Sequence, residues 1–267
     1  MVITDLLERN ARFKGPEVAL VEVNPSEERD SAVTWREASL IESANAGTPY
    51  RREMTWKSFD RRANRFANLL LSRGFKRGTK VAILLMNSLE WLPLYFGILK
   101  AGCIAVPMNF RYSGDEIKYC LELADCEVLI FGKEFIERID TIANDIPDVK
   151  TMFYVGKDGP EYSEDCCAMM NYCSSEAPPI MLQEEDHAAI YFSSGTTGFP
   201  KAILHNHKAL LSSCMTEQNH HGQSEDDVFL CIPPLYHTGA KMHWFGSFLM
   251  GGKAVLLKGT KPKHVLE

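Results

Sequence analysis

The sequence predicts an α/β protein whose mainly parallel sheets are layered with helices. Short apolar runs alternate with stretches of helical periodicity along most of the chain. This alternation is typical of βαβ units, because two parallel strands need a long crossover that is usually a helix. The 267 residues, 45% apolar and 24% charged, have the composition of a folded protein of one or two domains.

The first part of this pattern begins with a helix over residues 56–70. The run at 81–86 is continuously apolar, which is typical of a buried strand, and it is followed by a helix at about 88–100 and a short strand at 103–108. The first helix is amphipathic, with one stripe of residues that faces a core: Trp56, Phe59, Ala63, Phe66, Ala67 and Leu70.

The pattern continues with a helix that a capping box predicts. Ser113 is followed three residues later by Glu116, the spacing at which each side chain bonds the backbone of the other. Strands at 127–131 and 151–155 then flank a helix expected over 134–144.

Two stretches interrupt the pattern. Residues 24–55 are charged and aperiodic, which indicates a surface insertion. Residues 156–186 hold eight acids, one lysine and three prolines, which favours an acidic connecting segment. We therefore expect a first α/β subdomain over residues 1–175 and the start of a second one over 187–267.

Charge and cysteine spacing exclude several function classes. A net charge of −6 opposes nucleic-acid binding, which needs positive charge against the phosphates. The eight cysteines form no Cys-x-x-Cys pair, and neither His205 with His207 nor His220 with His221 is completed into a ligand set, so no metal site is predicted. The sequence shows no signal peptide and no run long enough for a transmembrane segment, so we expect a cytoplasmic protein.

The segment with the clearest chemistry is residues 193–201, SSGTTGFPK, which follows an apolar run. Its glycines permit close approach of the backbone, and successive free N–H groups form a concavity for anions. Four hydroxyls and a terminal lysine add donors and positive charge. The segment lacks the Gly-Lys-Ser/Thr end of a Walker loop. We predict a phosphate-binding loop made by Ser193, Ser194, Gly195, Thr196, Thr197, Gly198, Pro200 and Lys201.

In its order of residues, the segment 193–201 resembles the phosphate loop of the adenylate-forming (AMP-binding) acyl-CoA synthetase family. GILKAGCIAVPMN at 97–109 and PPLYHTGA at 233–240 resemble two further segments of that family. The resemblance implies the fold of the family's large N-terminal domain. It also implies that a carboxylic acid, of a chain length that the sequence does not indicate, is activated with ATP and Mg²⁺ to an acyl-adenylate, and that the acyl group is then transferred to coenzyme A.

The resemblance also implies roles for single residues. His237 matches the gate beside the acyl pocket, where its imidazole would contact the carboxylate or shape the pocket, and His205 matches a positioning histidine. Trp244 and Phe245 follow the gate and are candidates for the acyl pocket or for the core.

The resemblance extends over only about the N-terminal half of a family member. The adenine-binding Tyr-Gly-x-Thr-Glu segment, the ribose-binding aspartate and the C-terminal lysine domain have no counterpart in residues 202–267. We therefore expect this chain to be inactive alone, with no certain catalytic residue, and the missing C-terminal half to belong to the parent protein.

Two alternatives remain. One is a naturally truncated, non-catalytic nucleotide-binding or regulatory module. The other is amino-acid adenylation for a carrier protein, which the absence of an aspartate near Leu235-Tyr-His237 disfavours.

Overall fold

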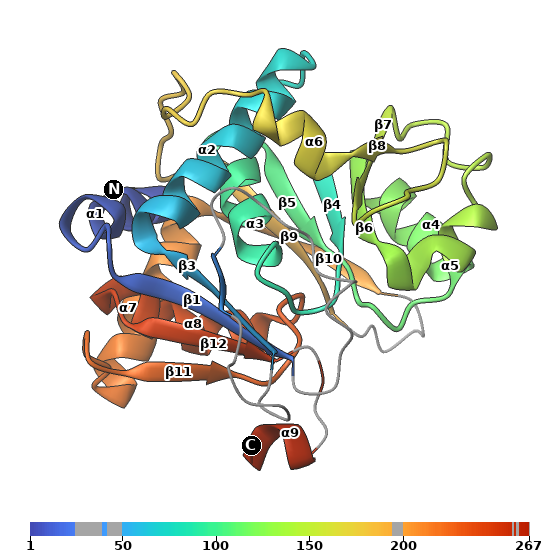
Figure 1. Ribbon diagram of the computed structural model, residues 1–267. Helices are drawn as coiled ribbons and strands as arrows, with labels where there is room; N and C mark the ends of the chain where they lie inside the picture. Colours follow the sequence, from blue (N-terminus) through green and yellow to red (C-terminus); the bar gives the residue numbers. More distant parts are fainter. Residues whose placement is uncertain (25–38, 42–49, 194–199, 258, 260–261, 267) are drawn as a thin grey trace.

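The computed structural model describes residues 1–24, 39–41, 50–193, 200–257, 259 and 262–266. Two sheets and their covering helices make up the fold (Figure 1). The predicted α/β class with mainly parallel sheets is confirmed, since most neighbouring strands in the larger sheet run parallel.

The larger sheet has seven described strands, in the order β10-β9-β5-β4-β6-β7-β8. Only β9 and β10 pair antiparallel. The strands are β4 (Lys80–Leu84), β5 (Ile104–Pro107), β6 (Cys126–Gly132), β7 (Thr151–Val155), β8 (Glu164–Asp165), β9 (His187–Ser193) and β10 (Lys201–Asn206).

The smaller sheet has the order β11-β12-β1-β3-β2 and joins strands from the two ends of the chain. β1 pairs parallel with β12 and antiparallel with β3. The strands are β1 (Val18–Asn24), β2 (Ser39–Ile41), β3 (Tyr50–Thr55), β11 (Val228–Cys231) and β12 (Lys253–Leu257).

The helices separate the two sheets and cover the outer face of the larger one. One hydrophobic core joins α1, α2, α3, α7 and α8 to a face of each sheet, and a second core holds α4 and α5 against the other face of the larger sheet (Figure 1). The α-helices are α1 (Ile3–Phe13), α2 (Trp56–Ser72), α3 (Trp91–Lys100), α4 (Gly114–Leu123), α5 (Ile136–Asp140), α6 (Cys166–Asn171), α7 (His207–His221), α8 (Thr238–Met250) and α9 (Pro262–Leu266).

Local sequence signals locate several of these elements closely. Ser113 and Glu116 form the predicted capping box at the start of α4. The helix expected over 134–144 is shorter: a 3₁₀ turn leads into α5, and the Thr141 hydroxyl donates to the carbonyl of Arg138, one turn back. Such side-chain bonds compete with the helical pattern of the backbone.

Residues 24–55 were predicted to form a surface insertion. Their described part includes β3, which is an inner strand of the smaller sheet. Arg52 of β3 is buried and pairs with Glu22 of β1 and with Glu90, at the start of α3. Both carboxylates bond the guanidinium, which offsets the cost of burying the three charges.

The expected division into subdomains on either side of 156–186 does not coincide with a division of the sheets. Both sheets contain strands from before and after that segment, since β9 and β10 extend the sheet of β4–β8, and β11 and β12 extend the sheet of β1–β3. Within the described ranges, no helix is both long enough and apolar enough to cross a lipid bilayer.

Candidate functional site

The predicted phosphate loop connects the antiparallel strands β9 and β10. Ser193 ends β9 and pairs in register with Lys201, which begins β10, so these two residues close the loop. The Lys201 side chain is exposed. Ser194, Gly195, Thr196, Thr197 and Gly198 lie outside the described residues, and their predicted role stays a prediction.

A cavity of about 680 Å³ opens at the carboxyl end of β9. β9 runs parallel to its neighbour β5, so the carboxyl ends of both strands meet at one edge of the sheet. In open α/β sheets this edge is where ligands bind. The cavity is lined by Pro107, Asn109, Arg111, Tyr112, Glu116, Tyr191, Phe192, Ser193, Pro200, Tyr236, His237 and Thr238. Both ends of the phosphate loop and the predicted gate histidine therefore share one cavity.

His237 caps the N-terminus of α8. Its Nδ1 accepts a hydrogen bond of 3.2 Å from the backbone N–H of Gly239. An accepting Nδ1 carries no proton, so the neutral imidazole holds its proton on Nε2. His237 is exposed at the cavity wall, where an Nε2–H can donate to an anionic oxygen.

Asn87 holds the backbone of the segment that directly precedes His237. This buried residue follows β4, and its amide makes two bonds to that segment: Oδ1 accepts from the Leu235 N–H at 2.7 Å, and Nδ2 donates to the Pro233 carbonyl at 3.0 Å. The sequence analysis missed this role. The one feature of the sequence that could have indicated this role is the amide side chain directly after a buried apolar strand.

Trp244 and Phe245 lie in the aromatic core and do not line the cavity just described. Both are at most 1% exposed, and Trp244 stacks on Phe248 with ring centroids 4.8 Å apart. Phe96 of α3 contacts the Trp244 ring edge-on. The sequence left two roles open for Trp244 and Phe245, and their contacts favour the core role. The acyl-pocket role stays a prediction.

The two histidines after the phosphate loop, His205 and His207, have different surroundings. The ring of His205 contacts Tyr191, and burial, together with the nearby Lys241, lowers its pKa. His207 is fully buried at the start of α7, and burial lowers its pKa to about 4. Each therefore favours the neutral imidazole.

Folding also brings His221 beside two residues that the sequence analysis did not consider. Glu217 accepts from His243 at 2.8 Å and lies 3.2 Å from His221. One potential ligand atom from each of Glu217, His221 and His243 lies within 4.8 Å of the others, a grouping that the sequence did not predict.

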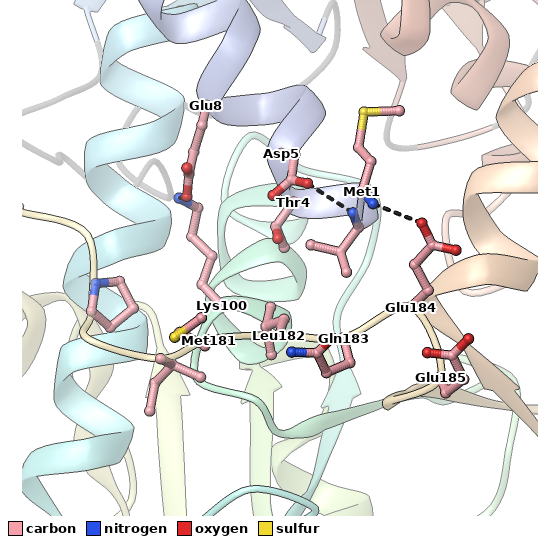
Figure 2. Close-up of a pocket in the computed structure, with 13 residues that line it drawn as sticks. Met1, Thr4, Asp5, Glu8, Lys100, Met181, Leu182, Gln183, Glu184 and Glu185 are labelled. Atoms are coloured by element: carbon pink, nitrogen blue, oxygen red, sulfur yellow. Dashed lines mark hydrogen bonds and ion pairs between the residues drawn. The ribbon is translucent and has the colours of Figure 1, made fainter.

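A second cavity, of about 500 Å³, lies between α1 and the segment that leads into β9 (Figure 2). Its wall carries the carboxylates Asp5, Glu8, Glu184 and Glu185. Its one lysine, Lys100, is bonded to Glu8. A polyphosphate would be repelled by these acids, so the cavity at the end of β9 is the better candidate for a nucleotide.

Comparison with known proteins identifies the family to which the chain belongs. The family model "AMP-binding enzyme" matches residues 29–267. The chain is 27% identical over 233 residues to a medium/long-chain-fatty-acid–CoA/3-oxocholest-4-en-26-oate–CoA ligase of Mycolicibacterium smegmatis, covering 80% of this chain and 42% of that protein. It is 29% identical over 188 residues to a long-chain-fatty-acid–CoA ligase of Mycobacterium tuberculosis, covering 70% of this chain and 36% of that one.

Among solved structures, an anthranilate CoA ligase in complex with anthranoyl-AMP superimposes with a TM-score of 0.83 at 26% identity. The alignment covers 97% of this chain and 45% of that one. The chain thus spans less than half the length of each of these relatives. A family match over most of its residues, together with this fold, shows that the chain belongs to the AMP-binding enzyme family.

Proposed function

We propose that this chain is the N-terminal part of an AMP-forming acyl-CoA synthetase. The observation that carries the proposal is the shared cavity at the carboxyl end of β9, which joins both ends of the phosphate loop to His237. In the reaction, the carboxylate of the acid attacks the α-phosphate of ATP, and pyrophosphate leaves. The thiol of coenzyme A then attacks the acyl carbon, and AMP leaves.

The chemical difficulty is the approach of a carboxylate to a polyanion. Residues 193–201 would hold the β- and γ-phosphates through backbone N–H groups, hydroxyls and Lys201, which spreads the negative charge. His237 would donate from Nε2 to the acid and hold it near the α-phosphate.

Magnesium is implied by the family, and the described cavity wall tests whether this chain could hold it. Glu116 is the one carboxylate among the residues that line the cavity, and it already accepts from the Ser113 N–H as part of the capping box. Mg²⁺ prefers several oxygen ligands. The described residues do not provide that set, so no step is assigned to the ion. It would arrive on the phosphates of ATP.

Two sheet edges support a larger parent protein. Ile203 and Leu204 on β10, at the edge of the larger sheet, are 45% and 46% exposed, and Val228 on β11, at the edge of the smaller one, is 58% exposed. Exposed apolar edge strands usually pair or are covered. We propose that residues beyond 267 cover these edges, and that the full-length protein works in the cytoplasm. Sequencing the gene past codon 267 tests the first of these points.

ATP–pyrophosphate exchange in the full-length protein, with pooled carboxylic acids, tests the activity. Lys201→Ala and Thr197→Ala should each lower exchange by about 10- to 150-fold, the equivalent of one charge-assisted hydrogen bond of roughly 1.5–3 kcal/mol. Lys208→Ala, at an exposed lysine of α7, is the matched control and should exchange normally. No exchange with any acid would refute the synthetase.

The same panel separates the two alternatives. Faster exchange with amino acids than with fatty or aromatic acids would indicate adenylation for a carrier protein. Calorimetric binding of ATP without exchange would indicate a regulatory nucleotide-binding module.

A further inference from the structure

Helix α8 buries a lysine beside the cavity, and no ion pair is found for it among the described residues. Lys241 lies one helical turn after His237, and its side chain is 0% exposed. Its Nζ lies 4.8 Å from the ring centroid of Trp91, 5.0 Å from that of Tyr95 and 4.3 Å from that of Tyr191. Among the residues that the structure describes, none accepts a hydrogen bond from this amine. We call these three rings and the amine the Lys241 cage.

Other buried donor groups near α8 also lack a hydrogen-bond acceptor among the described residues. The indole N–H groups of Trp91 and Trp244 are buried with no hydrogen-bond partner within the described ranges. The hydroxyls of Tyr95 and Tyr191 share one hydrogen bond of 2.8 Å, so one of the two O–H hydrogens is not used in it. Buried donors normally find acceptors, and leaving them unpaired costs free energy. The lysine amine and the two indoles are therefore buried polar groups without a hydrogen-bond partner among the described residues.

The Lys241 cage adjoins the proposed active site. Tyr191 lines the cavity at the end of β9 and is also the ring closest to the lysine amine. His237 lies on the same cavity wall, and four residues of helix place Lys241 about 6 Å further along α8. Lys241 itself does not line the cavity, so a group of the acid bound at His237 would reach the amine past the ring of Tyr191.

We propose that the Lys241 cage binds a second carboxylate of the substrate, so that the enzyme activates one end of a short dicarboxylic acid. This inference rests on the proposed synthetase function and names its substrate class. Lys241 would act as the residue that determines specificity, because a methyl group at the same place would leave the buried amine unpaired.

The electrostatics of the cage agree with an anionic occupant. Burial holds the pKa of Lys241 well below its usual range, and of the described groups the Cys231 thiol opposes that effect. A carboxylate that enters the cage would favour the ammonium form, so binding should take up a proton. Aromatic rings also stabilise a cation by themselves, and in that case the cage would need no anion.

Matched acid pairs in the full-length protein separate these two interpretations. Succinate, glutarate and adipate are compared with butyrate, valerate and hexanoate in ATP–pyrophosphate exchange. At the best chain length, the wild type should favour the diacid by at least about tenfold in kcat/KM. Lys241→Met, which keeps the length without the charge, should remove that preference and leave exchange with the monoacid within a few-fold. Lys208→Met is the control and should behave as the wild type.

Tryptophan fluorescence gives a second measurement that does not depend on turnover, because Trp91 borders the cage. Glutarate or adipate should change the emission of the wild type and not that of Lys241→Met. Calorimetry in two buffers of different ionisation enthalpy should show proton uptake in the wild type alone.

The outcomes distinguish this inference from the proposed function. Exchange with monoacids and an unchanged preference in Lys241→Met would overturn the inference and leave the synthetase intact. A diacid-dependent emission change that needs Lys241, without any exchange, would support the cage and refute the synthetase. Neither exchange nor an emission change would refute both.

Discussion

Asn87 offers the most direct test of how the fold positions His237. We expect Asn87→Ala to destabilise the chain and to weaken binding of the acid, because its amide holds the backbone two and four residues before the histidine. The two bonds are not equivalent. The bond to the Leu235 N–H is buried, whereas Pro233, whose carbonyl accepts the other bond, is exposed and can be hydrated instead.

The magnitude follows from that difference. A buried N–H left without a partner costs about 1–3 kcal/mol, and replacing a bond to an exposed carbonyl by one to water costs roughly 0.5–1.5 kcal/mol. Asn87→Ala should therefore lower the free energy of unfolding by about 2–4 kcal/mol, most of it from the Leu235 amide. Urea denaturation followed by circular dichroism measures this value.

Ser88→Ala is the matched control, since Ser88 is the next residue and no side-chain hydrogen bond is found for it in the described part of the chain. It should change stability by less than about 0.5 kcal/mol. In the full-length protein, Asn87→Ala should also raise KM for the acid more than KM for ATP. Equal denaturation midpoints for the two variants, with unchanged KM values, would refute the positioning role.

Three further predictions concern single side chains. His237→Ala should change acid preference or raise KM for the acid in the exchange assay, and a change in the ATP dependence alone would contradict the gate assignment. Arg52→Ala should cost about 3–5 kcal/mol in urea denaturation, because it leaves two buried glutamates uncompensated. Arg51→Ala, which removes an exposed ion pair, should cost less than about 1 kcal/mol. Similar losses of stability in Arg52→Ala and Arg51→Ala would argue against a stabilising role of the buried Arg52 triad. Because the pKa of His207 is about 4 when folded and about 6.5 when unfolded, the unfolded chain binds more protons between these pH values, and stability should fall by about 1.6 kcal/mol from pH 6.5 to pH 5. His207→Leu should lose that contribution and the exposed His220→Leu should keep it; equal pH dependence in both would show that His207 does not titrate in this way.

Local patterns were sufficient for the elements that depend on neighbouring residues. The stripe of α2, the capping box of α4 and the apolar run of β4 each appear in a short window of sequence, because periodicity and capping are local properties. The ordered string at 193–201 was likewise sufficient to indicate the family, which the match over residues 29–267 confirms.

Long-range pairing was not accessible from those windows. The charged stretch that ends in β3 was expected at the surface, yet Arg52 is buried because two glutamates distant in sequence meet it. The pairing of β12 with β1 joins opposite ends of the chain in one sheet, and no local window of sequence indicates it.

The sequence by itself determined the fold class, most of the central βαβ elements and the family, since each depends on residue types at short spacing. Only the tertiary structure decided what lies around His237 and along α8. Asn87 is held against the segment before His237, and Lys241 is enclosed by rings from α3 and β9. Such contacts join residues far apart in the chain, and their energies come from burial and from unmet hydrogen bonds, which no local pattern records.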